Sequence, residues 1–298
     1  MSVLGVADAA FWIKTLVVGA VSGVLSGMFG IGGGMITTPA IRLLLGGSAI
    51  AAVATPLPII IPTAITGAVG YTRRGLADVR AGWIVGGSGA LAAVAGAYAT
   101  RWIGGSALMI ATGVLVVYMA ADMLFAGRRA GAGAHAPEPS VSASEEGPLL
   151  VSDDAVDGAP ASDADASAAP AGTRAPAAKL ALLGLGAGLY SGLLGLGGGF
   201  VIVPLLIRLF GFGTKRAIGT SLVAIAILSV PGTITHALLG HIDWRLAIAL
   251  SLTVIPGAWL GARVTAAASE RHVRAAFAIM LAVVGVVMFA NEAWVLVR

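Results

Sequence analysis

The chain alternates between long apolar stretches and short polar connections. The apolar runs cover residues 11–46, 49–71, 81–100, 102–126, 180–210, 216–240, 245–266 and 275–297. A helix that crosses a bilayer needs about 20 predominantly apolar residues, and each of these runs reaches that length. The pattern predicts an all-α, polytopic membrane protein with two sets of four apolar segments.

The two sets are separated by a polar segment of different composition, residues 127–179. This linker is rich in Ala, Pro, Ser and Asp, and it holds 8 of the 14 acidic residues of the chain. Such a composition cannot bury enough apolar surface to form a core, so we expect the linker to be disordered. The chain therefore divides into a first membrane repeat at 11–126, the linker at 127–179 and a second membrane repeat at 180–297.

The two sets match each other at a constant offset of 165 residues, without a gap. The pairs include Gly23 and Gly188, Ser26 and Ser191, Pro39 and Pro204, Thr55 and Thr220, Asp78 and Asp243, and Arg80 and Arg245. Glycine matches alone could arise by chance in a chain with 43 glycines. A register that also holds through Pro, Thr, Asp and Arg indicates an internal duplication.

Each repeat opens with three glycines spaced four residues apart. They are Gly19, Gly23 and Gly27 in the first repeat and Gly184, Gly188 and Gly192 in the second. Residues four apart share one face of a helix, and small residues on that face let a neighbouring helix approach closely. We interpret these glycines as helix-packing positions.

A glycine-rich interruption follows in each repeat. The two segments read Gly30-Ile31-Gly32-Gly33-Gly34 and Gly195-Leu196-Gly197-Gly198-Gly199, and each is followed by a proline, Pro39 or Pro204. Each glycine in a helix interior costs about 0.8–1 kcal/mol relative to alanine, and proline lacks the N–H donor. We therefore expect the first segment of each repeat to be broken or re-entrant. The alternative is that the glycines only permit tight packing or a kink.

A helix broken at membrane depth suggests a binding site. Its freed N–H groups and the positive end of the following half-helix can bind an anion without a cationic side chain, and paired breaks mark the substrate site in many secondary transporters. The predicted substrate-binding residues are Ser26, Gly30, Gly32, Gly33, Gly34, Pro39 and Thr55 in the first repeat and Ser191, Gly195, Gly197, Gly198, Gly199, Pro204, Thr220 and Ser221 in the second.

The positive charges favour inverted repeats. If every apolar run crosses the membrane, the 18 Lys and Arg residues divide ten to eight between the two sides. If the first segment of each repeat is re-entrant, they divide thirteen to five. Cytoplasmic loops carry the Lys and Arg excess, so we expect inverted repeats with a cytoplasmic linker. The two interruptions would then face each other, with their tips meeting near the midplane.

Composition excludes several other classes of protein. The chain is 58% hydrophobic and 11% charged, with a mean hydropathy of +0.95. Its net charge of +4 is spread singly and in pairs, so we expect no nucleic acid partner. The absence of Cys removes disulfides and thiolate metal ligands. The glycine segments lack the strand, acidic residue or lysine of nucleotide-binding loops. We therefore predict no cofactor.

A few titratable residues stand out in the apolar runs. His236 and Asp122 are candidates for proton coupling, although Asp122 lies near the end of its run, where it could also reach water or pair with arginine. His236, His241 and Asp243 lack the further ligand that a metal site needs, so we predict no metal. Asp78 precedes an apolar run, as Asp243 does, and both are predicted helix N-caps.

The sequence resembles one known family. The pattern Gly23-xx-Ser26-Gly27-xx-Gly30-x-Gly32-Gly33-Gly34-xxxx-Pro39 and its second copy from Gly188 to Pro204 are similar to those of the sulfite exporter family TauE/SafE. The polar linker and the Gly-His-Ile-Asp-Trp stretch at 240–244 fit that family too. The first copy departs from the second at Pro56, Pro58 and Pro62, where the second has Ser221, Val223 and Ile227.

The resemblance implies a transporter, and more narrowly an exporter, of sulfite or a related small sulfur-containing anion. Together with the residues, it predicts a secondary transporter in a prokaryotic plasma membrane, with the lipid bilayer, a small anion and a proton or other coupling ion as partners. The alternatives are a passive anion channel and a carrier of another small organic anion. An enzyme is not expected, because Ser26 and Ser191 lack matching His and acid partners.

Overall fold

The computed structural model describes residues 3–99, 175–194 and 197–297, together with isolated positions between 102 and 121. All regular elements within these residues are α-helices. Six apolar helical spans within the described residues are long enough to cross a membrane. These spans are Phe11–Phe29, Ile50–Thr72, Val79–Ala99, Ala177–Leu194, Thr214–Leu238 and Trp244–Ala267. The predicted all-α membrane architecture is thereby confirmed. Linker residues 127–174, Asp122 and Gly195 lie outside the described residues, whereas residues 177–179, which were predicted to belong to a disordered linker, form the first residues of a helix that begins at Ala177.

The helices of the two halves begin at matching positions. The first half contains α1 (Val3–Phe29), α2 (Gly34–Leu43), α3 (Ala49–Ala54), α4 (Pro56–Thr72) and α5 (Val79–Ala99). The second half contains α7 (Ala177–Leu194), α8 (Gly199–Phe210), α9 (Thr214–Leu238), α10 (Trp244–Ala267) and α11 (Glu270–Val297). The starts of α2 and α8, of α3 and α9, and of α5 and α10 are each 165 residues apart.

One helix of the second half corresponds to two helices of the first. Helix α9 runs without interruption, whereas its counterpart is divided into α3 and α4 at Thr55. Pro56 stands at the first position of α4 and has no N–H to continue the hydrogen-bond ladder of α3. The corresponding residue of α9 is Ser221, which keeps that donor.

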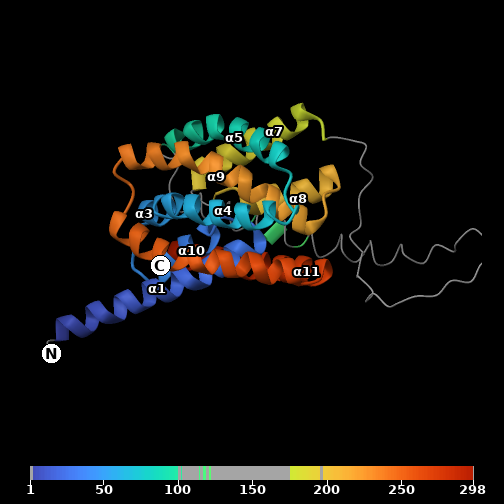
Figure 1. Cartoon of the computed structure of the whole chain (residues 1–298). Helices are drawn as coiled ribbons and strands as arrows, with labels where there is room; N and C mark the ends of the chain where they lie inside the picture. Colours follow the sequence, from blue (N-terminus) through green and yellow to red (C-terminus); the bar gives the residue numbers. More distant parts are fainter. Residues whose placement is uncertain are drawn as a thin grey trace, which may run out of the picture.

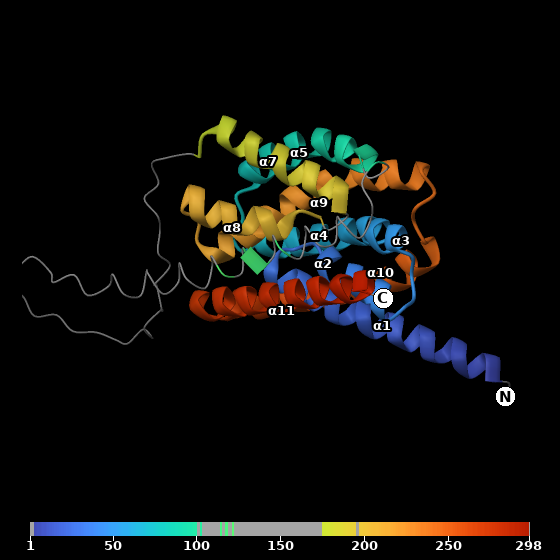
Figure 2. The ribbon, with the colours of Figure 1, turned by 180° about the vertical axis from the view of Figure 1, so that it is seen from behind.

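The bundle has three layers (Figures 1 and 2). Helices α5 and α7 form one outer layer, α1, α10 and α11 form the other, and α4 and α9 lie between them. The two halves are interlocked, because each main packing pair joins one helix of the first half to one of the second. Helix α1 packs along α10, α5 packs along α7, and α4 packs on α9. The first helices of the two halves begin at opposite ends of the bundle, α1 at the left and α7 at the right of Figure 1.

The spaced glycines are the points at which these paired helices cross. A methyl group added at Gly23 would overlap the carbonyl oxygen of Val254 in α10, and one at Gly188 would overlap the carbonyl oxygen of Gly89 in α5. Val254 and Gly89 are themselves 165 residues apart. The predicted packing role of these glycines is confirmed, because no larger residue fits while the backbones stay this close.

Candidate functional site

Each glycine interruption is a break between two helices. Helix α1 ends at Phe29 and α2 begins at Gly34. The backbone φ angles are +70° at Gly30, +75° at Gly32 and +84° at Gly33, a left-handed conformation that residues with a side chain rarely adopt. The corresponding positions Gly197 and Gly198 have φ angles of +77° and +71°.

The break is due to the glycines and not to the prolines. Pro39 lies inside α2 and Pro204 lies inside α8, and both helices continue through them. Glycine was predicted to interrupt the first segment of each repeat, and that prediction is confirmed at both positions.

The two breaks contact each other in the buried interior. A methyl group at Gly199 would overlap the carbonyl oxygen of Gly30, and one at Gly197 would lie 3.5 Å from the carbonyl oxygen of Ile31. Two fully buried side chains, Ile60 of α4 and Ile225 of α9, flank this meeting point. They are another pair related by the offset of 165 residues. The breaks are therefore enclosed by the two central helices.

The carbonyl group of Gly33 is tightly held at the start of α2. It accepts hydrogen bonds from the N–H groups of Ile36 (3.1 Å) and Thr37 (3.0 Å) and from the hydroxyl groups of Ser22 (3.0 Å) and Thr37 (3.0 Å). In a trans peptide the N–H points away from the preceding carbonyl, so the N–H of Gly34 points out of the helix N-terminus. Chemically, this arrangement is suited to an acceptor ligand.

Two of the predicted site residues have structural partners elsewhere. The hydroxyl group of Thr55 accepts a hydrogen bond from the N–H of Asp243 (3.1 Å), and the hydroxyl group of Thr220 accepts one from the N–H of Asp78 (2.9 Å). Each threonine thus connects one half of the chain to the turn that precedes α10 or α5. The assignment of Thr55 and Thr220 to the substrate site stays a prediction.

Two other predicted residues lie at the breaks. The hydroxyl oxygen of Ser221 in α9 lies 2.9 Å from the carbonyl oxygen of Gly30 and 2.8 Å from that of Ile218, and its single proton is shared between these two acceptors. In the second break, the Cβ of Ser191 lies 3.5 Å from the place where a methyl group on Gly198 would be. Ser221 therefore joins the second half of the chain directly to the break of the first half.

The residue missed by sequence reasoning is Tyr71. Its hydroxyl group donates to the carbonyl oxygen of Gly27 at 3.1 Å, close to the end of α1. Nε2 of His236 lies 3.4 Å from the carbonyl oxygen of Gly192, close to the end of α7. Both the donors and the acceptors are related by the offset of 165 residues, so tyrosine and histidine occupy the same structural position. The offset of 165 residues between Tyr71 and His236 could have indicated this shared position from the sequence.

His236 also contacts a second histidine. The Nδ1 atoms of His236 and His241 are 3.2 Å apart, so one ring must supply the N–H between them. No cluster of three or more metal-binding side chains occurs among the described residues.

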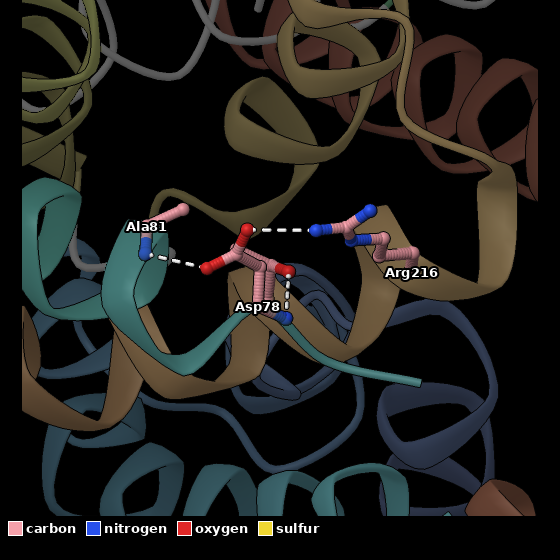
Figure 3. Close-up of polar contacts among 4 residues, drawn as sticks. Asp78, Ala81 and Arg216 are labelled. Atoms are coloured by element: carbon pink, nitrogen blue, oxygen red, sulfur yellow. Dashed lines mark hydrogen bonds and ion pairs between the residues drawn. The ribbon is translucent and has the colours of Figure 1, made fainter. Parts of the chain in front are cut away.

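The turn before α5 carries an ion pair (Figure 3). One carboxylate oxygen of Asp78 accepts from the N–H of Ala81 (2.9 Å), and the other accepts from Arg216 (2.8 Å). Asp243 likewise accepts from the first N–H groups of α10, so both predicted N-caps are confirmed. The position that matches Arg216 is Ala51, which cannot form the corresponding ion pair.

Two substitutions of Asp78 are expected to distinguish the contribution of the helix cap to stability from that of the ion pair. Asp78→Asn should lower the free energy of unfolding by less than about 1 kcal/mol, because Asn still caps and a partly exposed ion pair contributes little. Asp78→Ala should cost about 1 kcal/mol more. Thermal unfolding in detergent measures both, with Asp243→Ala as the cap-only control. Equal losses for the Asn and Ala variants would contradict this division.

A membrane-embedded helical bundle with two broken helices meeting in its interior is typical of a multi-pass membrane transporter. Residues 15–288 match the model of the family described as Sulfite exporter TauE/SafE. The chain belongs to this family, and the predicted resemblance is confirmed. It is a multi-pass transporter of the plasma membrane.

The relatives that the chain matches include proteins described as probable membrane transporters. The chain is 23% identical over 267 residues to the probable membrane transporter protein YunE of Bacillus subtilis, covering 87% of this chain and 89% of that protein. It is 35% identical over 103 residues to a probable membrane transporter protein of Xylella fastidiosa, covering 34% of this chain and 40% of that protein. No solved structure matches the chain.

Proposed function

We propose that the protein is a secondary transporter that exports sulfite or a related small sulfur-containing anion, bound where the two glycine breaks meet. The observation that carries the proposal is the outward-pointing N–H groups at the start of α2, beside a second break of the same kind. No Lys or Arg is found among the buried residues that the structure describes, so backbone and hydroxyl groups are the donors. The direction, export, rests on the family's description.

We further propose that the two halves are inverted repeats that move against each other. The matching helix starts, the packing of α1 with α10 and of α5 with α7, and the opposite ends at which α1 and α7 begin support this arrangement. Inverted repeats around a central site permit alternating access by rocking of one unit against the other. The enclosure of the breaks by Ile60 and Ile225 favours such a carrier over an open anion channel.

The substrate is tested with purified protein in proteoliposomes. Flux is measured separately for sulfite, thiosulfate, a short organosulfonate, acetate and chloride. Saturable flux of one or more sulfur anions, with little flux of acetate and chloride, is the expected result. Preference for acetate would indicate a carrier of another organic anion, and equal passage of all five anions would contradict the proposed selectivity.

The coupling ion is proposed to be a proton carried by the His236–His241 pair. His236→Tyr should keep the fold, because Tyr71 already makes the same contact with the carbonyl of Gly27. The variant should transport sulfite down its own gradient but lose most of the additional flux that an imposed pH gradient produces, since tyrosine does not titrate near neutral pH.

The matched control is Tyr71→Phe. It removes a hydrogen bond to Gly27 of the kind that His236 makes to Gly192, but it removes no group that titrates near neutral pH. A response to the pH gradient that is unchanged in His236→Tyr would exclude the histidine pair as the coupling group. In that case Asp122, outside the described residues, is the next candidate.

A further inference from the structure

We infer that the two breaks have different tasks: the first break donates hydrogen bonds to the anion, and the second does not. The inference rests on the proposed function, and it specifies which residues recognise the substrate. The two breaks share their glycines but differ in the hydroxyl groups around them.

More hydroxyl groups lie around the first break than at the matching positions of the second. Five residues with hydroxyl groups lie on or beside it: Ser22, Ser26, Thr37, Thr38 and Ser221. The positions related to them by the offset of 165 residues are Ala187, Ser191, Ile202, Val203 and Pro56. A single hydroxyl group, that of Ser191, thus remains at the positions that correspond to these five.

Three of the five hydroxyl groups bind carbonyl oxygens of the break. Ser22 and Thr37 donate to Gly33, and Ser221 donates in part to Gly30. A carbonyl oxygen that faced an anion would repel it, so fixing these oxygens leaves the N–H side of the peptides for the ligand.

The second break lacks this arrangement. The carbonyl oxygen of Gly198 accepts from the N–H groups of Val201 and Ile202. Ala187 and Ile202 occupy the positions of Ser22 and Thr37, and neither has a side-chain donor. The N-terminus of α8 is therefore formed without the hydroxyl contacts that orient the start of α2.

The remaining two hydroxyl groups, those of Ser26 and Thr38, are available to a ligand. Both residues are buried, with 0% and 1% of their surface exposed, and neither hydroxyl group has a hydrogen-bond partner. The oxygen of Ser26 lies 3.7 Å from the place where a methyl group on Gly33 would be. Ser26 therefore lies beside the residue that caps the N-terminus of α2.

Thr38 lies on the same side of the half-helix as its first residue. It follows Gly34 by four positions, which is about one turn, and Cα–Cβ bonds in a helix lean toward the N-terminus. A buried hydroxyl group without a partner is unfavourable. Two such groups near one helix N-terminus form a set of donors with the outward N–H groups of α2.

The ligand that fits these donors is a small oxyanion. Hydroxyl and amide groups are directional donors that bind oxygen acceptors, and they need no cation to do so. Sulfite, thiosulfate and the sulfonate group share this chemistry. The probes in the test are therefore sulfite, thiosulfate and methanesulfonate, each measured alone.

The test compares Ser26→Ala with Ser191→Ala, two buried serines at matched positions of the two breaks. Sulfite flux into proteoliposomes is measured against concentration. Ser26→Ala should raise the KM for sulfite about tenfold or more, because it removes a hydrogen bond to a charged ligand. Ser191→Ala should raise KM clearly less than Ser26→Ala does, because the second break is not inferred to donate to the anion. The anion with the lowest KM in the wild-type protein is the preferred ligand of the three.

Binding without transport provides a second measurement. Sulfite should raise the unfolding temperature of the wild-type protein and of Ser191→Ala in detergent, because a ligand that binds the folded state stabilises it. The rise should be smaller in Ser26→Ala and in Thr38→Val, which places at position 38 the valine already present at position 203. A variant that fails to fold is recognised by its unfolding temperature without sulfite.

Two results overturn the inference in different ways. Equal changes of KM in Ser26→Ala and Ser191→Ala, or a larger change in Ser191→Ala, would exclude the unequal roles of the breaks while leaving the proposed function intact. A wild-type protein that neither transports nor is stabilised by any of the three anions would contradict the proposed function, and this inference with it.

Discussion

Gly33→Leu should abolish transport while the protein still folds and inserts. The first atom of the new side chain would lie 3.5 Å from the hydroxyl oxygen of Ser22 and 3.7 Å from that of Ser26, so the rest of it would extend into the space in front of α2. An anion that can no longer form two charge-assisted hydrogen bonds loses about 3–6 kcal/mol of binding free energy. This loss corresponds to a decrease in sulfite flux of about a hundredfold or more.

The matched control for this variant is Gly46→Leu. Gly46 has a φ angle of +69°, similar to the +84° of Gly33, and no atom lies within 4 Å of the methyl position. Both variants carry the strain of a left-handed residue, about 1–2 kcal/mol. Normal sulfite flux in Gly33→Leu, or an equal decrease in the two variants, would contradict a site at the break.

Gly188→Ala should strongly destabilise the bundle. The added methyl group would overlap backbone atoms of Gly89, which cannot move aside as a side chain can. Helices α5 and α7 would have to separate along their whole contact, and overpacking of this kind costs about 1–3 kcal/mol or more. We expect a clear decrease in the unfolding temperature in detergent, with reduced yield of folded protein.

Gly186→Ala is the control on the same helix. No atom lies within 4 Å of its methyl position, and alanine is a better helix former than glycine by about 0.8–1 kcal/mol. This variant should unfold at the same temperature as the wild-type protein or slightly above it. If Gly188→Ala were as stable as Gly186→Ala, the close crossing of α5 and α7 would be wrong.

Much of the fold could be predicted because the relevant physics is local. The lengths of the apolar runs predict membrane helices, and clustered glycines predict a break. The break indeed occurs where Gly33 and Gly198 adopt left-handed backbone conformations. Asp78 and Asp243 were predictable as N-caps for the same reason, since each acts on the helix that directly follows it.

The contacts between the halves could not be predicted in this way. Thr55 meets Asp243 at a separation of 188 residues, and Thr220 meets Asp78 at 142 residues. Such pairs depend on which helices pack together, and the duplicated sequence does not specify that α1 packs along α10. The offset match of the two threonines therefore gave no sign that their hydroxyl groups accept hydrogen bonds from backbone N–H groups at turns of the other half.

Chemical differences between the halves concealed a shared role. Tyr71 and His236 look unrelated as residue types, so His236 was considered only as a titratable group and as a metal ligand. In the structure each contacts the matching carbonyl group, Gly27 or Gly192. In this pair the contact is the same in both halves, although the residue types differ. The absence of a matching residue type at an offset position therefore does not exclude a matching contact.

The most direct test of the central claim is sulfite counterflow in proteoliposomes. Vesicles containing the purified full-length protein are loaded with unlabelled sulfite and diluted into labelled sulfite, and uptake is followed over time and over a range of concentrations. A carrier with an enclosed anion site should accumulate label transiently above its external concentration, with a rate that saturates. Uptake that increases linearly with sulfite concentration, without any transient accumulation, would contradict the account and indicate a passive pore.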